Sequence, residues 1–172
     1  MTKFICKACG ECCKGEGAVF LYPEDIKKIA ENYSMTIQEA VNEYTEYVML
    51  ETIEKSGSYS YMPFLILKKN KSECIFLNSS LCVIHKFKPF QCEKSPFIVD
   101  FYTDEAWQAH IKKMCPALEK AKKKDFLEYS SIAEITEKAE LDYYRLLQEN
   151  SFNLEKILDI ELPSPKPLTY HG

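Results

Sequence analysis

The chain has 172 residues, of which 46% are hydrophobic and 28% charged, and its formal net charge is −4. This length and composition are ordinary for one soluble globular domain, alone or with an appendage, and allow a hydrophobic core without cross-links. The acidic balance predicts no nucleic-acid partner, and the longest apolar run, 62–67, is too short for a membrane span.

Half of the eight cysteines lie within eight residues near the start of the chain, in the pattern Cys-x-x-Cys-x-x-Cys-Cys. They are Cys6, Cys9, Cys12 and Cys13, and we call residues 6–13 the knuckle. Thiolates at this spacing can converge on one soft cation, whereas an even cysteine count can also indicate a disulfide scaffold. The first residues lack the apolar segment of a secretory signal, so we favour metal over disulfides and expect a cytoplasmic protein.

The adjacent thiols of Cys12 and Cys13, the vicinal pair, constrain the metal geometry. Neighbouring side chains on an extended backbone point to opposite sides, so both thiols reach one ion only through a tight local turn. We therefore expect the vicinal pair to serve two centres close together. Gly10, Gly15 and Gly17 would let the backbone wrap closely around the metal.

Two helices are expected after the knuckle. Pro23, followed by two acidic residues, is typical of a helix start, and Thr36-x-x-Glu39 is a capping-box pattern. Apolar residues at helical spacing extend the second helix to about Lys55.

Residues 59–85 favour strands, and Asn78-Ser79-Ser80 is a plausible hairpin turn between 74–77 and 81–84. Because strand side chains alternate, such a hairpin can present Cys74 and Cys82 to the same side. Cys92 follows shortly after this region.

A further helix is expected from about Asp104, with Trp107, Ile111 and Met114 on one stripe. Pro116 cannot lie inside that helix, so Cys115 is expected to cap a new turn that begins at Pro116. The helix dipole at that position would favour the thiolate.

Residues 125–160 lack cysteine and have a helical pattern. Ser131-x-x-Glu134 resembles a capping box, and a short helix is expected over 154–160. The expected buried stripe of the longer helix is Ile132, Ile135, Ala139, Tyr143 and Leu146.

These elements predict an α+β protein that is mainly helical, with a small antiparallel hairpin region organised around a cysteine metal cluster and a C-terminal helical extension. The predicted domains are a cysteine-cluster metal-binding domain at 1–124, a helical extension packed on it at 125–162, and a flexible, proline-rich extended tail at 163–172.

The predicted metal ligands are all eight cysteines: Cys6, Cys9, Cys12, Cys13, Cys74, Cys82, Cys92 and Cys115. Two zinc ions with four thiolates each fit this count, as do a [4Fe-4S] cluster with one zinc, or one cluster with thiols to spare. Nearby lysines, Lys14 and Lys88 among them, would compensate the thiolate charge, and His85 is a weaker candidate ligand.

The motifs together resemble the CxxCxxCC cysteine-cluster family of bacteria and archaea, a zinc- or iron-chelating domain whose members include relatives of the flagellin lysine methylases. The resemblance covers about residues 3–120 and includes 21–26, 74–77, 82–85, 88–92, 95–97 and 115–118. The sequence departs from the family pattern at His85, Lys88 and Ala117, where tyrosine, arginine and glycine are usual.

The resemblance implies metal binding and leaves three functions open. The first is a metal-binding protein with a structural or storage role. The second is an iron–sulfur enzyme of the protein-lysine methylase type, which would act on a protein substrate. The third is a metal-stabilised domain that binds a protein partner.

Overall fold

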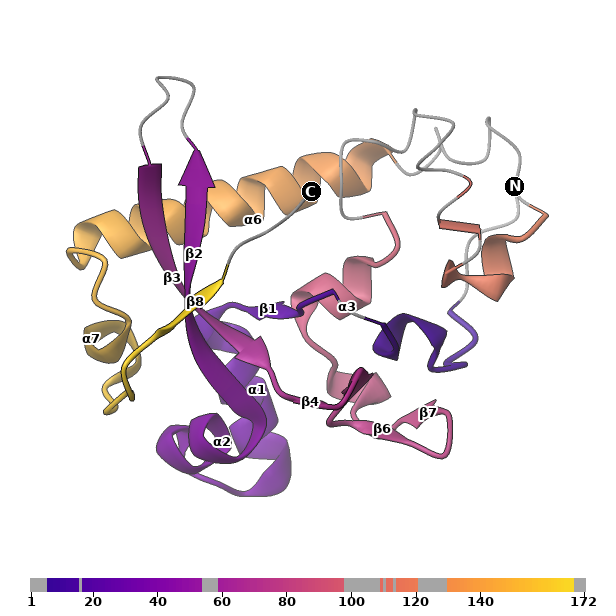
Figure 1. Ribbon diagram of the computed structural model, residues 1–172, viewed down its shortest axis with the longest axis horizontal. Coiled ribbons are helices and arrows are strands. Elements are labelled where there is room, and N and C mark those ends of the chain that lie inside the picture. The colour runs from indigo at the N-terminus through magenta and orange to yellow at the C-terminus, as the bar shows by residue number, and fades with distance from the viewer. Residues whose placement is uncertain are drawn as a thin grey trace. The chain divides into compact units, whose positions relative to one another are not determined.

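A computed structural model (Figure 1) describes residues 6–15, 17–53, 59–97, 109, 111–112, 114–120 and 130–168. The chain divides into two units: unit 1 comprises residues 1–17 and 69–140, and unit 2 comprises residues 18–68 and 141–172. Each unit is therefore assembled from two separate stretches of sequence. Helix α6, Ser130–Glu149, contributes its first half to unit 1 and its second half to unit 2.

Unit 2 contains a four-stranded sheet in the order β1-β3-β2-β8. Strands β2 (Thr45–Ile53) and β3 (Tyr59–Leu67) pair antiparallel along nine residues each. The short strand β1 (Phe20–Leu21) pairs antiparallel with β3, and β8 (Lys166–Leu168) pairs parallel with β2. This mixed sheet, visible in Figure 1, shows that the prediction of a mainly helical protein with only a small hairpin region is wrong.

The largest error is the second helix, for which the sequence pattern predicts an end near Lys55. Helix α2 (Ile37–Tyr44) ends at its cap, Thr45, and the chain continues as β2. Residues 45–53 include threonine, tyrosine, valine and isoleucine, which are common in strands, yet their apolar spacing also suits a helix. Pairing with β3 makes these residues a strand instead of a helix, and the local sequence pattern does not indicate that pairing.

The predicted starts of the two helices that follow the knuckle are confirmed. Helix α1 (Pro23–Tyr33) begins with its proline, and the carboxylate of Asp25 accepts a 3.0 Å hydrogen bond from the backbone N–H of Tyr22. At α2, the N–H of Glu39 donates to the Thr36 hydroxyl and the N–H of Thr36 donates to the Glu39 carboxylate, at 3.2 and 2.8 Å.

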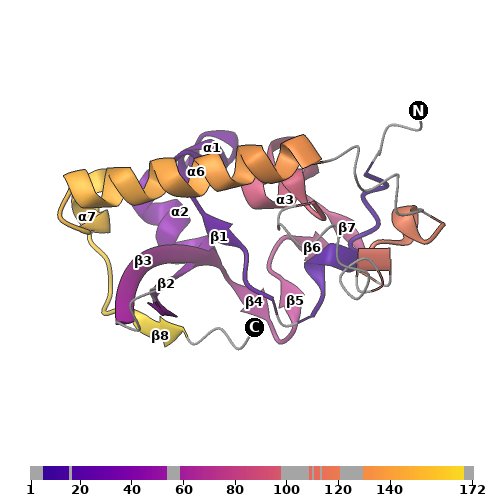
Figure 2. The ribbon, with the colours of Figure 1, turned by 90° about the horizontal axis from the view of Figure 1, so that it is seen from above.

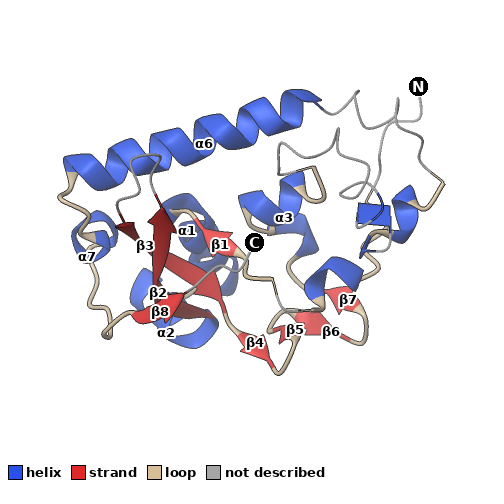
Figure 3. Cartoon of the chain, turned by 45° about the horizontal axis from the view of Figure 1, so that its top comes forward, coloured by secondary structure: helices blue, strands red, loops and turns tan. Residues whose placement is uncertain are grey.

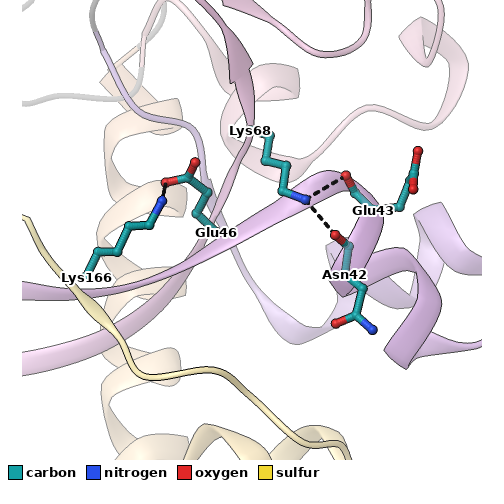
Figure 4. Close-up of polar contacts among 5 residues, drawn as sticks. All are labelled: Asn42, Glu43, Glu46, Lys68 and Lys166. Atoms are coloured by element: carbon teal, nitrogen blue, oxygen red, sulfur yellow. Dashed lines mark hydrogen bonds and ion pairs between the residues drawn. The ribbon is translucent and has the colours of Figure 1, made fainter.

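A lysine caps the other end of α2. The Nζ of Lys68 donates to the backbone carbonyls of Asn42 and Glu43, at 2.5 and 3.1 Å (Figure 4). A cation at this end of a helix satisfies carbonyls that have no partner within the helix and opposes the negative end of its dipole. Lys68 directly follows β3, so the contact fixes the end of the sheet to the end of α2.

The core of unit 2 lies where one face of the sheet packs against the second half of α6. Val48 and Phe64 are paired across β2 and β3, and they are buried together with Tyr143 and Leu147. The rings of Phe64 and Tyr143 lie 4.9 Å apart between centroids. Ile157, from the short helix α7 (Leu154–Leu158), is packed against the same cluster.

The buried stripe of α6 differs from the predicted one. Ile135 is 47% exposed, and the residues that are buried are Ala133, Thr136, Tyr143 and Leu147. Ser131 lies inside the helix rather than before it. The predicted short helix after α6 is confirmed, although it ends at Leu158 instead of Ile160.

The sequence predicts an extended tail at residues 163–172 and no strand pairing there. In the structure, β8 lies within this segment and pairs with β2. Its residues pair with 48–50 of β2, and the Nζ of Lys166 lies 3.0 Å from the carboxylate of Glu46 (Figure 4). Figure 2 shows this strand at the edge of the sheet, beside β2.

Unit 1 is built from short elements. Two small hairpins follow one another, β4 (Lys69–Asn70) with β5 (Glu73–Cys74) and β6 (Leu77–Asn78) with β7 (Leu81–Cys82) (Figure 3). Helix α3 spans Phe90–Lys94, and short 3-10 helices span Glu11–Cys13, His85–Phe87 and Pro116–Leu118.

The predicted turn at residues 78–80 is confirmed, but the predicted strand 74–77 is not, since Cys74 lies in β5 and pairs with β4 while the turn joins β6 and β7. Its two central residues, Ser79 and Ser80, have φ values of 47° and 67°, as a tight turn between antiparallel strands requires. Of the helix predicted from Asp104, Trp107 lies outside the described residues, whereas Ile111 and Met114 are helical and Ile111 is fully buried.

Candidate metal centre

The vicinal pair lies in a tight turn. Cys12 and Cys13 belong to the 3-10 turn Glu11–Cys13, which is preceded by Gly10 in the left-handed conformation at φ 74°. The N–H of Cys13 donates to the Gly10 carbonyl at 2.9 Å and closes the turn. The extended backbone assumed for the vicinal pair is therefore wrong, and the geometric reason for assigning its thiols to different centres is removed.

Two hairpin cysteines meet the vicinal pair. The thiol of Cys13 is hydrogen-bonded to the thiol of Cys12 and to those of Cys74, from β5, and Cys82, from β7. We call these four residues the first thiol set. The sulfurs around a tetrahedral zinc ion lie about 3.8 Å apart, for Zn–S bonds of about 2.3 Å, and thiols also hydrogen-bond over about that separation. Each of the other three sulfurs in the first thiol set therefore lies within hydrogen-bonding distance of the Cys13 sulfur.

Backbone N–H groups of later residues point at the sulfurs of three cysteines. The Cys74 sulfur accepts from Phe76, the Cys82 sulfur accepts from Ile84, and the Cys115 sulfur accepts from Ala117 and Leu118. A donor two residues after each cysteine stabilises negative charge on its sulfur, as a metal-bound thiolate requires.

Cys13 is the hydrogen-bond partner that the other three thiols of the first thiol set share. The hydrogen bond from Cys13 is the main cause that lowers the pKa of Cys12, to about 6, and that of Cys82, to about 7. The same interaction lowers the pKa of Cys74. The bonds to Cys12, Cys74 and Cys82 raise the pKa of Cys13 itself. A divalent cation bound by these sulfurs would take the place of the Cys13 thiol proton.

Two lysines bring positive charge to this set. Lys88 favours the thiolates of Cys12 and Cys82, and it thereby contributes to their lowered pKa values. Lys69 acts in the same way on the pKa of Cys74, and its Nζ donates to the Gly15 carbonyl just after the knuckle. Lys88 is a sequence candidate for this role, whereas Lys69 was missed because only the pairing of β4 with β5 brings it beside Cys74.

The other four cysteines are less tightly gathered. Burial is the main cause that raises the pKa of Cys92, which also feels the charges of Cys74, Cys12 and Cys82 and so adjoins the first thiol set. Cys115 interacts through charge with Cys9, and Cys6 is exposed. All eight cysteines are free thiols.

Cys115 caps a 3-10 turn that begins at Pro116, as predicted. The expectation that the helix dipole favours the Cys115 thiolate is wrong. Burial outweighs the N–H hydrogen bonds and raises the pKa of the Cys115 thiol. A turn of three residues has little dipole with which to oppose that desolvation.

Among the described residues, no group of three or more histidine, cysteine, aspartate or glutamate side chains already has the spacing of a bound metal ion. The four sulfurs of the first thiol set are thus joined by hydrogen bonds and do not have the spacing of metal ligands. His85 begins the turn after β7, and its buried Nε2 has no hydrogen-bond partner within the described part of the chain.

Comparison with known proteins assigns the chain to a family. Residues 5–128 match the model of the CxxCxxCC family, described as a "putative zinc- or iron-chelating domain", and the chain belongs to this family. No curated protein and no solved structure is significantly similar to the chain. No helix within the described residues is both long enough and apolar enough to cross a membrane.

Proposed function

We propose that this protein binds zinc or iron through cysteine thiolates, and that the first thiol set forms one four-thiolate centre. The observation that carries the proposal is the meeting of four thiols from three separate elements around Cys13: the knuckle, β5 and β7. The family match supports metal chelation as the common activity of such chains.

The donor chemistry suits these metals. Thiolates are soft ligands that prefer zinc or iron–sulfur clusters to magnesium or calcium, and both accept four cysteines. A four-thiolate zinc site carries a net charge of about −2, which Lys69 and Lys88 would offset. When bound, the metal would supply a cross-link that fixes the knuckle to the two hairpins.

We propose a second centre on the remaining thiols. Cys9 and Cys115 interact through charge, and the backbone N–H bonds to the Cys115 sulfur suit a thiolate there. Cys6 lies three residues before Cys9, at the usual spacing of paired thiolate ligands. Cys92 adjoins the first thiol set and would complete the eight ligands.

A metal-stabilised interaction domain is the second candidate, and one observation favours it. Ile75, Leu81 and Val83 are exposed by 36, 60 and 51%, although they lie in the small hairpin region that carries Cys74 and Cys82.

Eight free thiols persist in a reducing compartment, so we propose the cytoplasm as the place of action.

Purification without air, followed by elemental analysis, tests the function. We expect at least one zinc or iron atom per chain, colourless protein for zinc and brown protein for an iron–sulfur cluster. A thiol titration before and after a strong chelator should show at least four thiols released together with the metal. Eight freely reactive thiols in fresh protein without metal would contradict the proposal.

A further inference from the structure

Gly10 occupies a position at which a side chain has no room. A Cβ atom on Gly10 would lie 2.6 Å from Leu77 Cδ1, 2.6 Å from the Ser80 carbonyl oxygen and 3.0 Å from the Ser80 carbonyl carbon. Real Cβ atoms do not approach other heavy atoms to 2.6 Å. The backbone of the knuckle therefore lies directly against the hairpin β6–β7.

The two contacts differ in how easily they yield. Leu77 Cδ1 is the end of a side chain and can rotate away. The Ser80 carbonyl belongs to the turn backbone, where Ser79 and Ser80 both have positive φ values. Moving that carbonyl means rebuilding a turn whose conformation ordinary side chains already tolerate poorly.

This contact joins the two halves of the first thiol set. Gly10 caps the turn that contains the vicinal pair, and Leu77 pairs directly with Cys82 across the hairpin. We infer that Gly10 is a positioning residue of the metal centre, because the absence of its side chain sets the distance between the knuckle thiols and Cys82. This inference rests on the proposed function and adds to it a residue that touches no metal.

The other two glycines near the knuckle provide matched controls. Gly15 has φ 94° and nothing within 4 Å of the position that a Cβ atom would take, so Gly15→Ala introduces backbone strain without a collision. Gly17 also has open space, and no unusual φ, so Gly17→Ala introduces neither. Gly10→Ala introduces both, since its φ is 74°.

The test is a cobalt(II) titration of the reduced full-length chain, with zinc competition, for the wild type and the three alanine variants. Charge transfer from thiolate sulfur to cobalt reports how many thiolates hold each bound ion. We expect Gly10→Ala to weaken cobalt binding about tenfold or more. We also expect it to lower the charge-transfer absorption per bound cobalt, which a purely structural loss of stability would not change.

Hydrogen exchange on the same samples separates positioning from unfolding. Strands β2 and β3, in unit 2, should keep their amide protection in Gly10→Ala. Loss of that protection would contradict a local role. Gly10→Ala binding with the affinity and absorption of Gly15→Ala would overturn the inference while leaving the proposed function intact. Absence of cobalt and zinc binding by the wild type would overturn the proposed function, and the role of Gly10 with it.

Discussion

The hydroxyl of Tyr143 donates a 2.7 Å hydrogen bond to the backbone carbonyl of Pro63. The donor lies on α6 and the acceptor lies in β3, eighty residues earlier in the chain. Pro63 faces Met49 in the sheet, so this bond ties the second half of α6 to the middle of the long strand pair. It is buried, so removal of the hydroxyl would remove a hydrogen bond that solvent does not replace.

Tyr143→Phe should therefore lower the free energy of unfolding of unit 2 by about 1 kcal/mol, since the ring stays and only the hydrogen bond is removed. Denaturant unfolding measures this change. Tyr144→Phe is the control, because the neighbouring tyrosine is 36% exposed, and that variant should change stability little. Equal losses in the two variants would contradict the importance of the Pro63 bond.

The wild type and Tyr143→Phe should respond differently to alkaline pH. Burial raises the pKa of Tyr143 above the ordinary value of a tyrosine, about 10. The folded state then keeps a protonated phenol where the unfolded chain ionises, so the stabilisation is complete below about pH 10 and is lost as the pH rises further. The stability difference between wild type and Tyr143→Phe should shrink above that pH, as urea unfolding at several pH values would show.

Leu147→Ala should destabilise unit 2 by about 2–5 kcal/mol without changing the metal content, because Leu147 is fully buried and all eight thiols lie outside unit 2. Leu141→Ala removes the same atoms one to two turns earlier in α6, where the side chain is 51% exposed, and should have a small effect. Elemental analysis of both variants tests whether the metal content stays unchanged. Lost metal in Leu147→Ala would mean that unit 2 supports the centre.

Metal removal should unfold unit 1 selectively. The proposed centre cross-links residues 12–13 to residues 74 and 82, and a structural zinc site can contribute on the order of 10 kcal/mol to folding. A chelator should lower the melting temperature sharply and release amide protection in unit 1, while β2 and β3 remain protected. An unchanged melting curve for protein proven to lack metal would show that no folding energy comes from the metal.

The vicinal pair should act at one centre. Because Cys12 and Cys13 share one turn and both belong to the first thiol set, Cys12→Ser and Cys13→Ser should each lose the same metal equivalent. A serine hydroxyl is a hard and rarely ionised group, hence a poor ligand for a soft ion.

Cys6→Ser is the matched control for the vicinal pair, since Cys6 is exposed and outside the first thiol set, so it should spare this centre. Metal analysis of the double variant Cys12→Ser/Cys13→Ser gives the decisive comparison. A double variant that loses one equivalent more than either single variant would favour separate centres for the two thiols.

Most signals confined to a few residues were read correctly from the sequence, the capping box expected at Ser131 being an exception. The capping box at Thr36, the proline that begins α1, the turn at residues 78–80 and the cap at Cys115 all depend on the chain within four residues. The family was also identified correctly, because its cysteine spacing is written directly in the sequence.

Features that depend on distant partners were not predicted. Residues 45–53 form a strand because β3 lies beside them, and the short strand β8 exists only through its pairing with β2. Ile135 was assigned to the buried face of α6 from its spacing. Which residues of the helix are buried depends, however, on the surfaces against which the helix packs. Cys74 and Cys82 were expected on one side of a single hairpin, whereas they lie on two hairpins, and their approach to Cys13 depends on how both hairpins meet the knuckle.

The division of unit 1 into two stretches of sequence has a consequence for the timing of synthesis. Cys13 and Cys74 are separated by 61 residues (74 − 13), and all of the intervening chain up to residue 68 belongs to unit 2 except residues 14–17. A ribosome that adds about 5–20 residues per second needs about 3–12 seconds to make that stretch. During that period the thiols of the nascent knuckle are present before the hairpins have been synthesised. The proposed centre can therefore be completed only after most of the sheet of unit 2 has been synthesised.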